Sequence, residues 1–310
     1  MVSALVSAAA VDPGLRLAVG SRCAHGEGVL WDQEKQHVLW VDIDGARLWL
    51  HRPGDGHTRA WALPDRAGCI GLGEDGSLLL ALAKGLYRAE LDAATDTLPL
   101  QHLEAVELEQ SHTRVNDGRA DRHGNFVFGT MNEHPQRTPS GSFYQYSAAH
   151  GLRRLPLPGV AIPNSICFSP DGLTVYWCDS VTPRILCGDY DPHRAQVGAV
   201  RGFVRIEDDA GASPDGSTVD ADGYLWNAQW GASRVVRYRP DGTVDRIVPL
   251  PVPQPSCCAL GGPDLDTLYV ITSPQGLDAE ARAAAPGSGG LYALSVPGCR
   301  GLAESRVALP

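Results

Sequence analysis

The chain has 310 residues, of which 43% are hydrophobic and 20% charged, and its formal net charge at pH 7 is −10. A chain of this length can bury a stable core without disulfides, and its composition is that of a globular protein with no long apolar run. Nucleic acids and anionic membrane surfaces are bound mainly through Lys and Arg, so the acidic balance argues against both as partners. A small-molecule ligand fits better.

The N-terminal segment and the cysteines bear on where the protein works. The first ten residues, MVSALVSAAA, carry no Lys or Arg and lack a proper apolar h-region, so no secretory signal is predicted. Most of the eight cysteines lie in apolar strand-like runs, where Cys behaves as a small buried hydrophobe. No Cys-x-x-Cys pair occurs, so structural zinc is not supported. We expect a cytoplasmic protein with reduced thiols.

One pattern recurs along the chain: a turn rich in Asp and Gly, followed by an alternating or apolar strand. Its six instances start 42 to 51 residues apart: WDQEKQHVLWVDI from Trp31, GEDGSLLLAL from Gly73, DRHGNFVFGT from Asp121, SPDGLTVYWCDS from Ser169, DADGYLWNAQW from Asp220 and GPDLDTLYVITS from Gly262. Each is followed by a second strand-like piece, and this period matches a four-stranded propeller blade of about 40–50 residues. The repeat predicts an all-β, six-bladed β-propeller.

The ends of the repeat set the predicted domain boundaries. The last unit lacks a strand, which the segment RLAVGS from Arg16 is expected to supply, closing the ring. Only LDAEARAAA, near residues 277–285, has the periodicity of a short helix. No linker or composition shift divides the chain. We predict one domain over residues 1–310, with the propeller proper at about 14–300, and a monomer or weak homo-oligomer.

Polar residues stand just upstream of four repeat instances, where the chain should enter the innermost strand of a blade. They are Glu27, Asn116, Asn164 and Asp215, four or five residues before the instance that follows each. Equivalent positions in different blades converge on the channel, and two carboxylates with two carboxamides suit a hard divalent cation. The alternative is that Asx-Gly and Pro-Asp-Gly are ordinary turns. The repeated placement favours a central metal site.

These segments resemble the SMP-30/gluconolactonase/regucalcin family of six-bladed propeller lactonases. The similar segments are GEGVLW, RVNDGRADRHGNFVFGTM, PNSICFSPDGLTVYWCDS, SPDGSTVDADGYLWNAQW and PSCCALGGPDLDTLYVITS, which span about residues 26–273 in order. Two positions depart from the family pattern: Val29 stands where Pro is usual, and Ser165 where Gly commonly follows Asn. Both adjoin expected ligands without replacing one, so we expect changes in pocket shape only.

The resemblance implies roles for particular residues. Glu27, Asn164 and Asp215 correspond to the family's ligands for one divalent metal ion, which could be Ca, Zn, Mn, Mg or Fe. Arg114 and Asn116 correspond to substrate contacts, with Asn116 close to the metal. Glu133 falls where members often place an acidic substrate contact.

The expected reaction is the metal-dependent hydrolysis of a sugar lactone to its aldonic acid, a step of carbohydrate metabolism. A divalent metal can polarise the lactone carbonyl or lower the pKa of bound water. Asp215 is assigned a second, catalytic role in proton transfer because no histidine occupies a blade-equivalent channel position. His25, beside Glu27, and Trp230 are weaker candidates for the pocket. Arg114 is expected to act on substrate more than on folding, since truncation at a channel mouth leaves no core cavity.

Two other functions fit parts of the pattern. One is an enzyme on the same propeller that acts on an aryl ester, an organophosphate or an acyl-homoserine lactone. The other is a non-catalytic propeller that binds calcium. Arg114 and Asn116 favour a sugar over an apolar ester, because a bulky apolar pocket would suit the latter.

Overall fold

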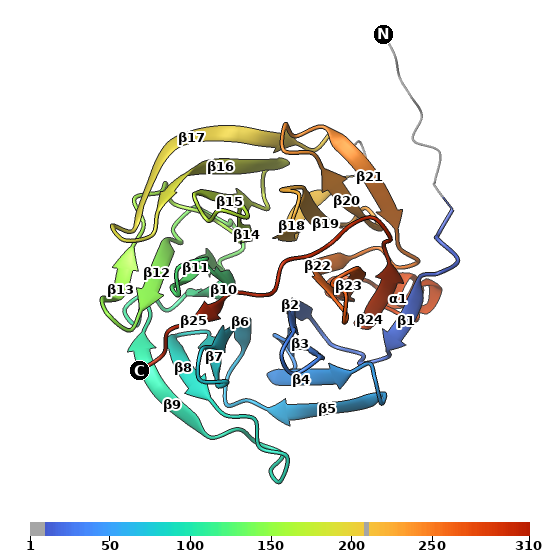
Figure 1. Cartoon of the computed structure of the whole chain (residues 1–310), viewed down its shortest axis with the longest axis horizontal. Coiled ribbons are helices and arrows are strands. Elements are labelled where there is room, and N and C mark those ends of the chain that lie inside the picture. Colours follow the sequence, from blue (N-terminus) through green and yellow to red (C-terminus); the bar gives the residue numbers. More distant parts are fainter. Residues whose placement is uncertain (1–9, 208–210) are drawn as a thin grey trace.

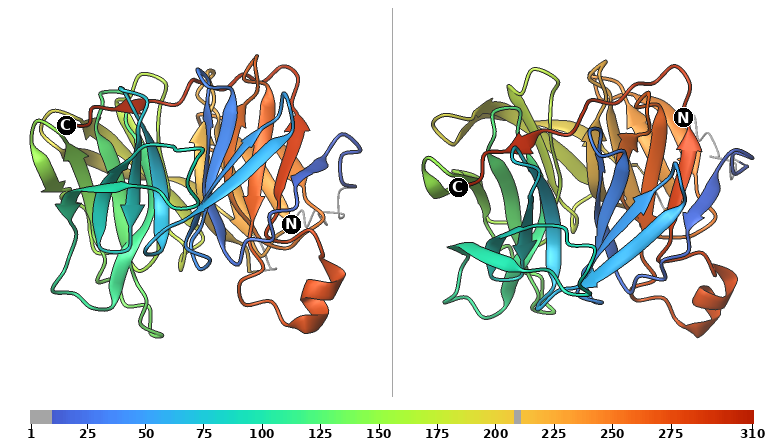
Figure 2. Two further views of the ribbon diagram at one scale, coloured as in Figure 1. Left: turned by 90° about the horizontal axis from the view of Figure 1, so that it is seen from below. Right: turned by 60° about the horizontal axis from the view of Figure 1, so that its bottom comes forward.

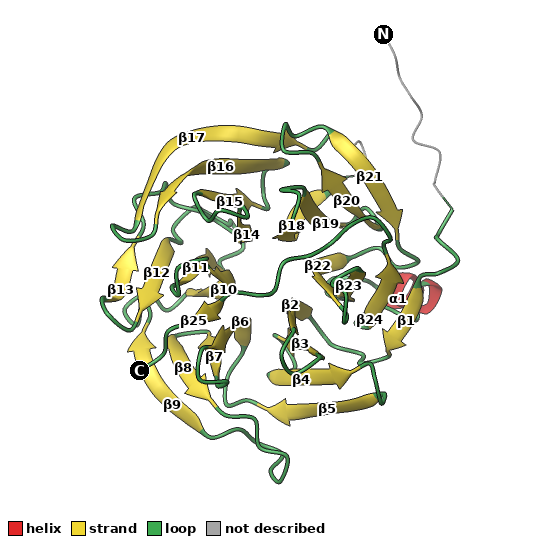
Figure 3. Ribbon diagram, in the orientation of Figure 1, coloured by secondary structure: helices red, strands yellow, loops and turns green. Residues whose placement is uncertain are grey.

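The computed structural model describes residues 10–207 and 211–310, and within these ranges the strands form six sheets arranged as blades around a central axis (Figure 1, Figure 3). The chain is therefore a six-bladed β-propeller, which confirms the all-β fold predicted from the repeat. Residues 1–9, which contain most of the segment interpreted as lacking a secretory signal, lie outside the described residues. Among the described residues, no helix is long and apolar enough to cross a membrane.

Each blade is an antiparallel meander that runs outward from the channel. Blade 1 consists of β2 (Gly26–Asp32), β3 (His37–Asp42), β4 (Arg47–Arg52) and β5 (His57–Ala62). Blade 2 consists of β6 (Ala67–Gly73), β7 (Leu78–Leu82), β8 (Gly85–Ala89) and β9 (Leu100–Ala105). Blade 3 consists of β10 (Thr113–Ala120), β11 (Phe126–Asn132), β12 (Phe143–Ser147) and β13 (Gly151–Arg154).

Blades 4 to 6 repeat this arrangement. Blade 4 consists of β14 (Pro163–Phe168), β15 (Thr174–Asp179), β16 (Arg184–Asp191) and β17 (Gln196–Arg205). Blade 5 consists of β18 (Ser213–Val219), β19 (Leu225–Trp230), β20 (Arg234–Tyr238) and β21 (Val244–Pro249). Blade 6 consists of β22 (Pro255–Gly261), β23 (Thr267–Thr272) and β24 (Leu291–Ser295), with an outermost strand from the N-terminus. The recurring turn of the sequence joins the first two strands of each blade.

The turn between β18 and β19 shows why the Asp-Gly pattern recurs. The Asp220 carboxylate accepts hydrogen bonds from the backbone N–H groups of Asp222 and Tyr224, at 3.1 and 2.9 Å. Gly223 has φ of 80°, a left-handed conformation that glycine adopts without steric cost. Asp thus fixes the start of the turn and Gly allows the chain to reverse.

Both ends of the chain pair with the ring. Strand β1 (Arg16–Val19) pairs antiparallel with β24 and completes blade 6, as the sequence predicted. Strand β25 (Arg306–Val307) adds to β6 in parallel, so pairing continues beyond the predicted propeller boundary near residue 300. Helix α1 (Ala279–Ala284) confirms the one helical segment expected.

The C-terminal segment also crosses one mouth of the channel on its way to β25 (Figure 1, Figure 2). It is held there by Glu304, which lies 3.5 Å from Arg119 at the end of β10, and by Arg306, which lies 2.9 Å from Asp32. Helix α1 lies on the opposite face (Figure 2). The inner strands begin at that opposite face, so the site faces away from the C-terminal segment.

The hydrophobic core is divided among the interfaces between blades. Each of the six buried clusters in the described ranges joins two neighbouring blades; Trp226 with Leu268, for example, connects blades 5 and 6. All eight cysteines are buried and free, which confirms the interpretation of Cys as a core residue. Because the sheets bury their faces against one another, they hold the inner strands rigidly around the channel.

Candidate active site

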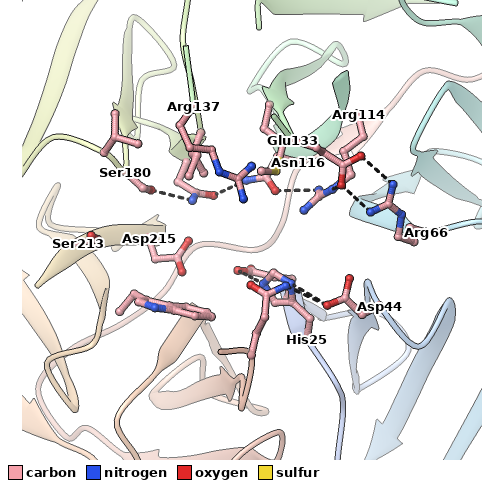
Figure 4. A pocket seen from close by; sticks show the side chains of 17 residues that line it. His25, Asp44, Arg66, Arg114, Asn116, Glu133, Arg137, Ser180, Ser213 and Asp215 are labelled. Carbon is pink, nitrogen blue, oxygen red and sulfur yellow. Dashed lines mark hydrogen bonds and ion pairs between the residues drawn. The ribbon is translucent and has the colours of Figure 1, made fainter. Parts of the chain in front are cut away.

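A cavity of about 400 Å³ opens at the mouth of the channel where the inner strands begin (Figure 4). All the site residues predicted from the sequence line it: Glu27, Arg114, Asn116, Glu133, Asn164 and Asp215. Figure 4 shows Arg66, Arg114 and Glu133 gathered on one side and Asp215 on the other. Side chains from four blades therefore meet in one polar cavity.

A shift of strand register places these side chains. Every inner strand of the six blades loses register with its neighbour close to its start. The shifts lie between Glu27 and Leu30, Ala67 and Cys69, Val115 and Gly118, Asn164 and Cys167, Pro214 and Ser217, and Pro255 and Cys257. A bulge of this kind bends the strand and redirects a side chain. Here it lets the mouth of the channel carry polar groups while the rest of each strand packs in the core.

The four residues found by counting are not strictly equivalent, however. Glu27 and Asn164 are the last paired residues before the shift, whereas Asn116 and Asp215 lie within it. The exact equivalence that the sequence suggested is therefore wrong by one position. The convergence still holds, because the shift brings both positions to the cavity wall.

In the other two blades the residue at the register shift contributes no side chain to the cavity, for steric reasons. In β6 the shift falls at Gly68, where an added Cβ would lie 2.4 Å from the backbone oxygen of Asn116. In β22 it falls at Ser256, whose hydroxyl is fully buried and donates to the backbone oxygen of Gly26 at 2.6 Å. The inner strands approach too closely at these points for a larger side chain.

Asp215 and Glu27 are the two carboxylates of the predicted cation site. Asp215 is 5% exposed, and its buried Oδ1 has no hydrogen-bond partner among the described residues. The Oε2 of Glu27 accepts from the backbone N–H of Gly28, at 3.1 Å. Burial, together with the neighbouring Asp117, raises the pKa of Glu27 to about 8; burial, together with Glu27, raises the pKa of Asp215. The two groups are held where negative charge is costly unless a cation or proton compensates it.

This arrangement predicts how stability depends on pH. A raised pKa means that the folded protein keeps protons that the unfolded chain releases above about pH 4.5. Without divalent cations, the melting temperature is therefore expected to fall as the pH rises from about 5 to about 8. Saturation with a bound cation should reduce this loss. Thermal unfolding in chelator and in excess cation, at several pH values, measures both; a flat profile in chelator would contradict the prediction.

Two arginines and Glu133 form the opposite wall. The Arg66 guanidinium donates to both oxygens of Glu133, at 2.6 and 2.9 Å, and the Nε of Arg114 lies 3.3 Å from the same carboxylate. Arg114 is only 5% exposed and also donates to the Asn116 side chain. Truncation of Arg114 would remove the donor to the buried Asn116 oxygen, whereas Glu133 would keep its two hydrogen bonds from Arg66. That Arg114 acts on substrate more than on folding stays a prediction.

Ser165, one of the departures from the family pattern, lies beneath the cavity floor. Its φ of 60° belongs to the left-handed region that favours glycine. The side chain offsets this strain, since its buried hydroxyl donates to the backbone oxygen of Asp215 at 2.6 Å. Asn227 donates to the same oxygen at 3.0 Å. Ser165 thus helps fix the backbone that carries Asp215.

His25 and Trp230 also line the cavity. His25 lies 3.9 Å from Glu27 and 3.8 Å from Asp44, and its ring meets that of Trp230 edge-on with centroids 5.7 Å apart. Burial, helped by the charge of Arg114, lowers the pKa of His25 to about 4. The imidazole is therefore neutral at pH 7 and able to hydrogen-bond a ligand.

Sequence reasoning missed several residues of the cavity wall, among them Arg66, Asp44, Arg137 and Ser180. Arg66 could have been found, because it stands directly upstream of an inner strand, where the polar residues of four other blades were recognised. Asp44 and Ser180 follow the second strands of their blades and carry no comparable signal. Arg137 lies on the connection between β11 and β12.

The donor set fits a hard divalent cation. No group of three or more His, Cys, Asp or Glu suited to a metal occurs in the described ranges, so a site here must draw on amide oxygens as well. The unpartnered Oδ1 of Asp215, the Glu27 carboxylate and the Asn164 amide provide oxygens of the kind that such cations prefer.

Fold and cavity together define a class: a six-bladed propeller with an acidic and amide-lined site at one mouth of its channel. Residues 25–274 match the family described as SMP-30/Gluconolactonase/LRE-like region, and the chain belongs to that family.

Among its relatives, an L-arabinolactonase from Azospirillum brasilense is 44% identical over 280 residues, which cover 89% of this chain and 90% of that protein. A 6-deoxy-6-sulfogluconolactonase from Pseudomonas putida is 34% identical, covering 92% and 96%. A solved calcium-binding protein, regucalcin from Agrobacterium tumefaciens, is similar with a TM-score of 0.85 and 31% identity, covering 95% and 97% of the two chains.

Proposed function

We propose that the chain hydrolyses a sugar lactone to its aldonic acid in this cavity, with the help of one divalent cation. The observation that carries the proposal is the meeting of Glu27, Asn164 and the unpartnered Asp215 oxygen opposite a wall of arginines. The lactonases among the relatives support the reaction class. The polar wall favours a hydroxylated ring over an aryl ester.

Glu27, Asn164 and Asp215 would hold the cation. When bound, such a cation stabilises negative charge on the ester carbonyl and lowers the pKa of water. The calcium-binding regucalcin among similar structures supports a divalent ion, and oxygen donors suit Ca, Mg or Mn better than soft metals. The cation would also remove the cost of keeping Glu27 and Asp215 ionised together.

The protein's own residues bind the ring and move the proton. Arg114 and Asn116 lie on one wall, where they can hydrogen-bond the substrate's hydroxyl or carbonyl oxygens. Glu133 holds Arg114 in place through their ion pair. It therefore orients a substrate-binding residue, in addition to any contact of its own with the substrate. Fixing the ring in this way contributes several kcal/mol to catalysis. Asp215, whose buried Oδ1 has no hydrogen-bond partner among the described residues, accepts the proton of the attacking water and returns it to the ring oxygen that departs.

A lactone panel tests the proposal. The protein is stripped of metal with a chelator, reconstituted separately with Ca²⁺, Mg²⁺, Mn²⁺, Zn²⁺ and Fe²⁺, and assayed by acid release with pentono- and hexonolactones. We expect at least one pentono- or hexonolactone to be opened only after reconstitution. An aryl ester and an acyl-homoserine lactone serve as controls. Faster turnover of those controls, or cation binding with no turnover, would contradict the proposal.

The proposed reaction needs no partner chain. That the protein is a cytoplasmic monomer or weak homo-oligomer stays a prediction, which cell fractionation and sedimentation would check.

A further inference from the structure

A chain of hydrogen bonds runs along the rim of the cavity from blade 3 to blade 5, and Ser180 stands near its end (Figure 4). The Ser180 hydroxyl lies 2.7 Å from the backbone oxygen of Pro214 and 2.9 Å from the side-chain amide of Asn164. That amide lies 3.1 Å from the amide of Asn116, which in turn lies 2.9 Å from the Arg114 guanidinium. The direction of each bond follows from the groups at its ends.

The backbone oxygen of Pro214 fixes the direction of the bonds at one end. A carbonyl oxygen can only accept, so the single hydroxyl proton of Ser180 is donated to it. The hydroxyl must then accept from Asn164, and the Asn164 atom that faces it is Nδ2. The Oδ1 of Asn164 therefore points the other way, along the cavity wall toward Asn116.

Arg114 and the backbone oxygen of Pro163 fix the orientation of the Asn116 amide, which leads to the same orientation of Asn164 from the opposite end of the chain of hydrogen bonds. The guanidinium of Arg114 can only donate, so the Asn116 atom that faces it is Oδ1. The Nδ2 of Asn116 donates to the backbone oxygen of Pro163 at 2.9 Å and to Asn164 Oδ1. Both ends thus demand the same orientation of the Asn164 amide, and its oxygen retains a lone pair for a ligand.

We infer that Ser180 is a positioning residue, which holds the Asn164 amide with its oxygen available to the cation; this deepens the proposed function and rests on it. Ser180 lines the cavity directly after β15 and is the last residue of the segment that begins at Pro163 and contains Asn164. Without its hydroxyl, Asn164 Nδ2 loses its partner, and the amide keeps one of the two hydrogen bonds that orient it, the one from Asn116. Pro214 keeps a weak sulfhydryl donor, Cys178 at 3.5 Å.

The experiment compares Ser180→Ala with Ser180→Thr, which retains the hydroxyl. Thr182→Ala is the matched control, because it removes an exposed hydroxyl of the same turn that donates to the Asp179 backbone oxygen and does not line the cavity. Side-chain amide signals are recorded by NMR on protein labelled with ¹⁵N-asparagine, and Asn116→Asp and Asn164→Asp variants assign them. Mn²⁺ affinity, melting temperature, kcat and KM are measured on the same samples.

In Ser180→Ala we expect the Asn164 signals to move, and those of Asn116 as well, although Asn116 does not touch Ser180. Mn²⁺ affinity should weaken about 2- to 10-fold, as the loss of one hydrogen bond allows. In Ser180→Thr both the amide signals and the Mn²⁺ affinity should be close to those of the wild type. Thr182→Ala should change neither of these two measurements. Unmoved amide signals in Ser180→Ala, or Mn²⁺ affinity equal to that of Thr182→Ala, would overturn the inference. If the wild type neither binds Mn²⁺ nor opens a lactone, the proposed function fails instead, and the amide signals still test the orientation.

Discussion

An Asp215→Asn enzyme is expected to lose at least about 100-fold in kcat, even when it is saturated with divalent cation. Asparagine keeps the size of the side chain and one carbonyl oxygen, so some cation binding should remain. It cannot accept a proton at neutral pH, and the loss of general-base assistance costs about 10²- to 10⁴-fold. The buried Oδ1 of Asp215, which has no partner among the described residues, is the atom available for that transfer.

Two controls separate proton transfer from cation binding. Metal content is measured on the same sample as the kinetics, so that only fully loaded enzyme is compared. Asp117→Asn makes the same substitution at a neighbouring, half-buried carboxyl that accepts from the backbone of Ile166 and does not line the cavity. Its loss in kcat should stay below about tenfold.

If fully loaded Asp215→Asn opens the lactone at close to the wild-type rate, Asp215 is a ligand only. The proton acceptor would then be sought at His25, whose Nδ1 is buried without a hydrogen-bond partner in the described part of the chain. Burial lowers the pKa of His25 to about 4, which makes it a poor proton acceptor at neutral pH. His25→Gln would then be combined with Asp215→Asn. If His25 is the proton acceptor, the double variant should lose activity that Asp215→Asn alone retains.

The sequence could predict the fold because each blade repeats its own local signals. Asp-Gly turns, such as the one before Leu225, and alternating strands recur at the period of a blade, and neither depends on distant contacts. The N-terminal closing strand was also predictable, because the last repeat visibly lacked a partner. Strand β25 was not, since a two-residue parallel pairing leaves no mark on Arg306 and Val307.

Only those cavity residues could be predicted whose motif lies within a single strand. Glu27, Asn164 and Asp215 stand at the starts of inner strands, and a single motif reveals each. The Arg66 contact with Glu133 joins the start of blade 2 to the end of β11 in blade 3, so no local pattern announces it. The register shifts that redirect the side chains depend on pairing between strands, and counting along the sequence missed them by one position.

Glu27→Gln is expected to weaken divalent cation binding by at least about 100-fold. At 4 Å, even two unit charges attract by about 4 kcal/mol in surroundings of intermediate polarity, which corresponds to almost three orders of magnitude in affinity. Local structure should survive, because a glutamine oxygen can still accept from the N–H of Gly28. Calorimetric titration with Mn²⁺ and Ca²⁺ measures the loss. Glu74→Gln, which removes the same charge from an exposed turn of blade 2, is the matched control.

The same variant should make the cation-free protein more stable at pH 8. Burial, and then repulsion by Glu27, raises the pKa of Asp215, so removing the Glu27 charge relieves the folded state of part of that cost. Cation affinity and cation-free melting temperature are thus predicted to change in opposite directions. A residue that served only the fold would lower the melting temperature when replaced and leave cation binding near its wild-type value. That result would remove Glu27 from the predicted ligand set, which would then consist of Asn164 and Asp215.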